Sequence, residues 1–139
     1  MRIIFLLATL LPSLACAADW IQLATTPEAR VLLDTESIEA APGGSKAWLK
    51  LLYHKKQPGQ TVTHGKPFDS STNQYYFVCD TQKYQVLKLI LFYKNNTVGS
   101  FNADLNLHNL DQAKLGTGIM FLMNKICPIS NPDSATQKP

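Results

Sequence analysis

Apolar and polar positions alternate along much of the chain with the two-residue period of a β-strand. The clearest case spans residues 46–54, where one face carries Trp48, Lys50, Leu52 and His54. The opposite face is apolar and consists of Ala47, Leu49, Leu51 and Tyr53. By the same reasoning, strands are predicted at 20–24, 30–34, 46–54, 73–80, 83–93 and 97–101.

The segment 83–93 differs from the others because it is apolar on both faces. Between residues 87 and 92 only Lys88 is polar. A strand of this kind is usually covered on both faces, so we expect it to be central in its sheet or to present one face to a partner chain. Asn95 and Asn96 follow it, and this pair predicts a tight hairpin because asparagine tolerates positive φ.

One helix is predicted near the C-terminus. We expect Thr117 to cap it through a hydroxyl that accepts hydrogen bonds from the first free amides, and Pro128 to end it. Apolar residues recur in between at i, i+3, i+4 and i+7 and form one helix face; they are Ile119, Leu122, Met123 and Ile126.

The remaining segments connect these elements. Residues 41–44 contain Pro-Gly-Gly and predict a turn, 55–60 and 102–115 are polar and irregular, and 61–71 is either a weak strand or a long connection. The predicted fold class is α+β: an antiparallel β-sheet with a C-terminal α-helix packed on one face.

The N-terminus has the features of a secretory signal peptide. Arg2 supplies a positive charge, and 3–11 is apolar except for Thr9 and about half as long as the roughly 20 residues of a membrane-spanning helix. Ala15-Cys16-Ala17 fits the small-residue cleavage site. We expect cleavage after Ala17 and a periplasmic or secreted protein. Leu14-Ala15-Cys16 also partly matches a lipoprotein signal, and acylation of Cys16 would instead tether the domain to the outer membrane.

Chain length and charge fit a single exported domain. The division expected is a signal peptide at 1–17, one domain at 18–128 and a flexible tail at 129–139, of which 131–139 contains two prolines and no large apolar residue. The whole chain carries 13 basic and 10 acidic residues. This balance is too even to indicate a nucleic-acid partner.

Cysteine usage points to a disulfide. Cleavage after Ala17 would leave Cys79 and Cys127, an even pair in a compartment where disulfides form and persist. Two separate buried thiols are the alternative. A metal site is not expected, because the two cysteines are far apart and no histidine pair lies near them, and no cofactor is implied.

Motifs for catalysis are missing from the sequence, which has no GxSxG, no glycine-rich phosphate loop and no HExxH. We therefore expect a protein that is not an enzyme. One cluster suggests binding instead: a basic patch on and after the strand at 46–54, which could attract an anionic glycan or another anionic surface. It consists of Lys50, His54, Lys55, Lys56 and Lys66.

Several short motifs occur in a characteristic order along nearly the whole predicted domain. They are Trp20, Val-Leu-Leu-Asp-Thr-Glu-Ser-Ile at 31–38, Ala-Trp-Leu-Lys at 47–50, Tyr-Phe-Val-Cys-Asp at 76–80, Val-Gly-Ser at 98–100 and the late Cys127. In this order they resemble the surface-adhesin protein E-like family of Gram-negative bacterial envelope proteins. The resemblance implies an antiparallel sheet with a helix, a disulfide between Cys79 and Cys127, and an adhesin that binds host matrix or serum proteins and can form a homodimer.

The function expected is therefore that of a non-enzymatic, exported, adhesin-like binding protein. A periplasmic accessory protein that binds an envelope partner or a small ligand is the alternative. No membrane span is expected in the mature domain.

Overall fold

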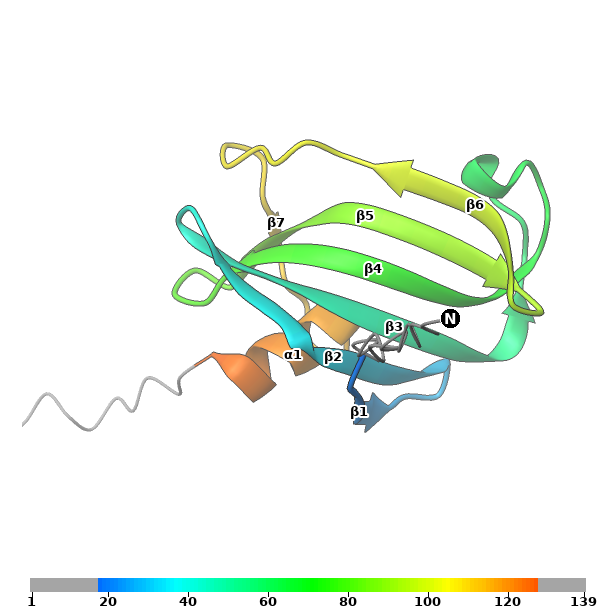
Figure 1. The fold of residues 1–139 in the computed structure, drawn as a ribbon, viewed down its shortest axis with the longest axis horizontal. Coiled ribbons are helices and arrows are strands. Elements are labelled where there is room, and N and C mark those ends of the chain that lie inside the picture. The colour runs from blue at the N-terminus through cyan, green and yellow to red at the C-terminus, as the bar shows by residue number, and fades with distance from the viewer. Residues whose placement is uncertain (1–17, 128–139) are drawn as a thin grey trace, which may run out of the picture.

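The computed structural model describes residues 18–127 as one antiparallel sheet with a single α-helix (Figure 1). The predicted fold class is confirmed. The expected signal peptide with Cys16 and the expected tail lie outside the described residues. The elements are β1 (Trp20–Thr25), β2 (Ala29–Ala41), β3 (Gly44–Gln57), a 3-10 turn η1 (Thr61–Thr63), β4 (Phe68–Val78), β5 (Lys83–Tyr93), β6 (Asn96–Asn102), β7 (Asp111–Gln112) and α1 (Gly118–Ile126).

The strands follow one another in the sheet in chain order, from β1 to β6, and every neighbouring pair is antiparallel. The short β7 pairs with the start of β5, beyond the end of β6. Short turns suffice for such a meander, because each strand pairs with the one before it. Among the described residues no helix has the length and apolar character needed to cross a membrane.

One face of the sheet holds the core, and α1 covers it. The apolar face of β3 contributes Ala47 and Leu49, both fully buried, and Leu122 of α1 is buried against the same cluster. Burying a leucine side chain contributes about 1.5–3 kcal/mol, so this contact fixes the helix on the sheet. Figure 1 shows α1 against the β1–β3 side of the sheet, in agreement with its contacts to β1 and β3.

The 3-10 turn η1 packs against β6 on the same face of the sheet. Direct pairing places Leu51, Ser71, Leu91 and Gly99 in one row across β3 to β6. A side chain at Gly99 would meet the Val62 carbonyl oxygen at 2.3 Å. Glycine is therefore needed at this position for η1 to lie so close to β6.

The hairpin between β2 and β3 is longer than the sequence pattern predicted. The expected turn is present, with Gly43 at φ +74°, but β2 continues to Ala41 and β3 begins at Gly44. A Cβ on Gly44 would lie 2.4 Å from the Phe77 carbonyl oxygen and 2.8 Å from the Tyr76 hydroxyl. The Tyr76 hydroxyl donates to the Pro42 carbonyl oxygen at 2.9 Å, which holds the turn against β4.

Two connections were assigned wrongly from the sequence. Residues 55–57 belong to β3 rather than to a loop, because β3 pairs again with β4 at Phe68 beyond a bulge and the Tyr53 and Phe68 rings pack edge to face at 5.5 Å. The turn between β5 and β6 falls on Lys94 and Asn95, one residue earlier than expected. The Lys94 amide donates there to the Asp69 carboxylate at 2.9 Å, which fixes the turn.

The predicted helix is present, but its cap differs from the prediction. Thr117 is the N-cap residue, yet its hydroxyl donates to the Lys114 carbonyl oxygen at 2.6 Å and accepts no hydrogen bond from the helix amides. The reason is the turn at Gly116, whose φ of +78° folds the chain back on itself just before the helix.

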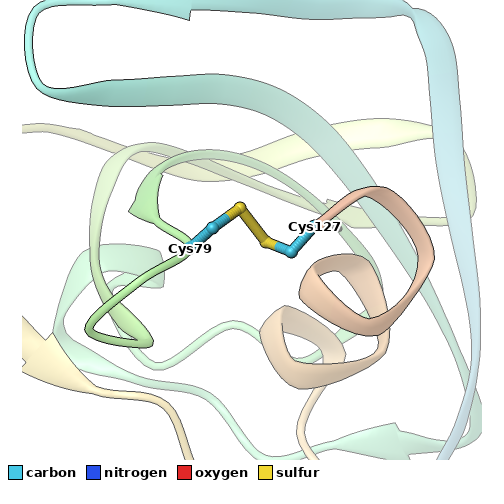
Figure 2. The surroundings of a disulfide bond; sticks show 2 residues. All are labelled: Cys79 and Cys127. Atoms are coloured by element: carbon cyan, nitrogen blue, oxygen red, sulfur yellow. A yellow bond between two sulfur atoms is a disulfide. The ribbon is translucent and has the colours of Figure 1, made fainter. Parts of the chain in front are cut away.

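A disulfide joins Cys79, just after β4, to Cys127, at the end of α1 (Figure 2). The two Cα atoms are 5.5 Å apart. The bond fastens the last turn of the helix to the end of a central strand. It therefore holds the C-terminal end of α1 over the core.

Candidate functional site

The face of the sheet opposite α1 carries a continuous polar and aromatic surface, which we call the open face. Direct pairing arranges its side chains in three rows across the strands. None of these residues is among the buried ones. The rows are Trp20, Asp34, Trp48, Gln74, Lys88 and Asn102; Gln22, Leu32, Lys50, Thr72, Ile90 and Ser100; and Arg30, Leu52, Ser70, Phe92 and Thr97.

Two lysines on the open face lie over tryptophan rings. The Lys50 ammonium lies 4.4 Å from the centroid of the Trp20 ring, and the Lys88 ammonium lies 6.0 Å from that of Trp48. A cation–π contact at an exposed site contributes about 0.5–1 kcal/mol. Each contact therefore restricts a flexible cation to a defined position while leaving its ammonium group able to bind an anion.

A hollow of about 200 Å³ lies beside Lys50 on the open face. Its polar lining comes from Lys50, the hydroxyls of Ser70 and Thr72, and Asn95, and its apolar lining comes from Leu52 and Phe92. An ammonium group flanked by two hydroxyls suits a carboxylate or sulfate, and the apolar side chains suit the hydrocarbon part of the same group. The hollow can therefore hold an acidic side chain of a partner.

Charge on the open face is mainly positive. Arg30, Lys50 and Lys88 project from its rows, and Lys46 lies on the same face of β3, two positions before Trp48. Two acidic residues oppose them: Asp34, which lies between Trp20 and Trp48, and Glu39, which pairs directly with Lys46. Such a surface attracts acidic partners, and the attraction weakens as salt increases.

The basic patch predicted from sequence is distributed over several places. Lys50 is on the open face. The His54 ring contacts the Thr26 carbonyl oxygen at 3.1 Å, near the turn between β1 and β2. Lys55 and Lys56 are exposed neighbours in β3, and successive strand residues point to opposite faces, so the two cannot both extend the surface around Lys50. Lys66 is exposed in the connection between η1 and β4.

Sequence reasoning missed Lys88 as a member of the site. Lys88 is the one polar residue in the apolar run of β5, and it lies on the same face as Ile90, two positions later. The sequence alone therefore already distinguished Lys88 from its neighbours. What the pattern could not supply is its neighbour across the sheet. Lys88 pairs with Gln74, which pairs with Trp48, and these contacts depend on the registers of β3, β4 and β5.

Within residues 18–127 no group of three or more histidine, cysteine, aspartate or glutamate side chains is arranged to hold a metal ion. The groups that the open face presents are cations, hydroxyls and aromatic rings.

Comparison with known proteins gives one match. A family model described as surface-adhesin protein E matches residues 20–127, from the first residue of β1 to the second cysteine of the disulfide. No curated protein and no solved structure matches the chain.

Proposed function

Because the chain belongs to the surface-adhesin protein E family, we propose that this adhesin-like protein uses its open face to bind an acidic segment of a host extracellular-matrix or serum protein. Family membership supports an exported or surface protein that binds a protein ligand without catalysis. The single observation that carries the choice of surface is the hollow beside Lys50, where a restrained cation, two hydroxyls and two apolar side chains converge.

The cations on the open face support an acidic ligand. Lys50 and Lys88 are held in adjacent rows by the two tryptophans, so they can engage two carboxylates of one extended segment. A hydrogen bond to a charged group contributes about 1.5–3 kcal/mol. Two such contacts, with apolar contact to Phe92 and Leu52, are enough to give specific recognition on a flat surface.

Charge reversal on the open face tests this proposal. The doubly substituted Lys50→Glu/Lys88→Glu protein should bind immobilised matrix and serum proteins at least tenfold more weakly than the unsubstituted protein, which corresponds to about 1.4 kcal/mol. Lys114→Glu/Lys125→Glu is the matched control, because it makes the same change of net charge at two exposed lysines just before and within α1, on the other side of the sheet. Equal losses in the two variants would show that net charge, rather than the open face, controls binding.

Competition and salt separate a protein ligand from a glycan. If heparin alone abolishes binding and an acidic peptide does not compete, the ligand is a sulfated glycan carried by the matrix and the proposal of a protein ligand is wrong. Binding should in either case weaken from low to physiological salt, since the contacts are charged and exposed.

The compartment is tested separately. Cleavage after Ala17 favours a periplasmic protein with an envelope partner, whereas acylation of Cys16 favours the outer surface. Protease treatment of intact cells should remove the protein if it is at the surface and spare it if it is periplasmic. Protection of the protein would overturn host binding as its role and support the periplasmic alternative.

The homodimer expected from the family resemblance stays a prediction. Light scattering of the mature protein would test it.

A further inference from the structure

A second cavity, of about 320 Å³, lies on the α1 face of the sheet, opposite the open face. Tyr53, Leu51 and Tyr75 form its floor on β3 and β4, and residues 116–119, at the start of α1, form one wall. Pockets that take small ligands have volumes of about 300–1,000 Å³. This cavity is at the small end of that range, so it fits a single ring rather than an extended chain.

Three tyrosines give the cavity its chemistry. The rings of Tyr75 and Tyr84 lie 5.8 Å apart at an angle of 56°, and Tyr53 lines the same cavity from β3. Burial raises the pKa of Tyr75, and the nearby Tyr84 and Tyr53 raise it further, so this phenol stays protonated. The three residues therefore offer aromatic surface together with neutral hydroxyl groups.

A hydrogen bond from Asn73 leaves the Tyr75 hydroxyl free to donate its own proton in a second hydrogen bond. The Asn73 side-chain amide lies 3.5 Å from the Tyr75 hydroxyl and 3.4 Å from the Ser71 hydroxyl, and it donates to both. Because the Tyr75 oxygen accepts from Asn73, its own proton is left for an acceptor on a ligand. Asn73 is only 6% exposed, and within the described residues its side-chain oxygen has no hydrogen-bond partner.

The start of α1 adds further donors. The Thr117 hydroxyl is bound to Lys114 and does not cap the helix. The amides of Gly118 and Ile119, two residues that line the cavity, are therefore not capped by that side chain.

The charges around the cavity disfavour anionic ligands. None of the described residues that line it is a lysine or an arginine, and Glu28 lies at its edge. Burial, and then the nearby Asp111 carboxylate, raise the pKa of Tyr84, so a second negative charge is close. An anion would be repelled by these carboxylates, with no lysine or arginine among the described lining residues to neutralise it.

From these features we propose that the cavity binds a neutral sugar ring of monosaccharide size. Such a ring has apolar C–H faces that pack on tyrosine, hydroxyl oxygens that accept from Tyr53, Tyr75 and the helix amides, and hydroxyl protons that donate to Glu28. This mixture of donors, acceptors and apolar surface matches the lining, and the site is independent of the protein-binding role proposed for the open face.

Titration of the mature protein with methyl β-D-glucopyranoside and with N-acetyl-D-glucosamine tests the proposal. We expect saturable shifts of the Gly118 and Ile119 amide NMR signals with at least one of these sugars. Tyr53→Phe and Tyr75→Phe each remove one hydroxyl and should weaken binding about three- to tenfold, the usual contribution of one hydrogen bond. Tyr93→Phe is the matched control outside the cavity and should leave affinity unchanged.

Three results would overturn the assignment. They are the absence of saturable binding for both sugars, an equal loss of affinity in the Tyr93→Phe control, and tighter binding of D-glucuronate than of the neutral glucoside. The last would show that the carboxylates near the cavity do not select against anions. Because a hydroxyl deletion leaves the packing of each ring in place, Tyr53→Phe should leave thermal unfolding unchanged, whereas Tyr75→Phe also removes an acceptor of the Asn73 amide and should lower the unfolding temperature slightly without unfolding the domain.

Discussion

Removal of the disulfide should cost about 4 kcal/mol of the free energy of unfolding. Cys79 and Cys127 are 48 residues apart in sequence. In the chain-entropy model a cross-link stabilises by about 2.1 cal/mol/K plus 1.5R times the logarithm of the loop length. For a loop of this size the sum corresponds to about 4 kcal/mol at 25 °C. A small domain is stabilised by only about 5–15 kcal/mol, so the bond supplies a large part of the total.

The position of the bond gives this loss a defined structural consequence. The closed loop contains β5, β6, β7 and α1, and the bond holds the helix end beside β4. Without it α1 remains attached through the burial of Leu122 and its neighbours alone. We therefore expect hydrogen exchange of the α1 amides to accelerate more than that of β3 and β4 amides.

Urea unfolding of the Cys79→Ala/Cys127→Ala protein, with the reduced unsubstituted protein as a control that keeps both sulfurs, measures the effect. Both should lose a similar free energy relative to the oxidised form. A loss below about 1 kcal/mol in both would refute the reasoning, because the loop would then already be restrained in the unfolded chain. A loss confined to the double variant would assign the effect to side-chain packing instead.

Three further predictions concern the core, the hairpin and alkaline pH. Leu122→Ala should lower the free energy of unfolding by about 2–5 kcal/mol in urea titrations, because Leu122 is fully buried; a loss below 1 kcal/mol would contradict its place in the core. Gly44→Ala should destabilise in the same assay, since its Cβ would lie 2.4 Å from the Phe77 carbonyl oxygen, whereas Gly65→Ala meets no neighbour within 4 Å and loses stability only through its positive φ. Burial raises the pKa of Tyr75 above its ordinary value of 10.0, so the contribution of Tyr75 to stability should be constant below about pH 10 and be lost above it, as the unfolded state loses its proton first; Tyr75→Phe should remove part of the alkaline fall in stability.

The two faces of the sheet suit different partners. The open face is broad, positively charged and shallow, which fits a surface on another protein, and its cations are positioned by aromatic contacts. The α1 face carries the tyrosine-lined cavity, for which we propose a small neutral ligand. The two proposals therefore assign separate ligands to the two faces of one meander.

Sequence patterns predicted the elements whose periodicity is local. The alternation at 46–54 gave the face of β3 that carries Leu49, and the spacing of Leu122 and its neighbours gave the apolar face of α1. The residue types also sufficed to place Trp48 and Lys50 on the opposite face of β3. These inferences succeed because the side-chain direction within a strand or helix depends only on the neighbouring backbone.

The alternation of apolar and polar residues could not predict the contacts between strands. The polar ends of β2 and β3 alternate weakly, so their extension into a long hairpin became visible only from the close approach of Gly44 to Phe77 and the bond from Tyr76 to Pro42. The Thr117 cap was predicted wrongly because a neighbouring carbonyl competes for the hydroxyl.

The sequence by itself determined which residues of each strand and helix share a face, the pairing partner expected for the two late cysteines through the family resemblance, and the class of fold. Only the tertiary structure decided that Lys88 joins Lys50 on one surface, that Lys55 and Lys56 do not both extend it, and that three tyrosines from three strands line one cavity. The physical reason is that register and bulges, which set the neighbours across a sheet, arise from the packing of the whole domain.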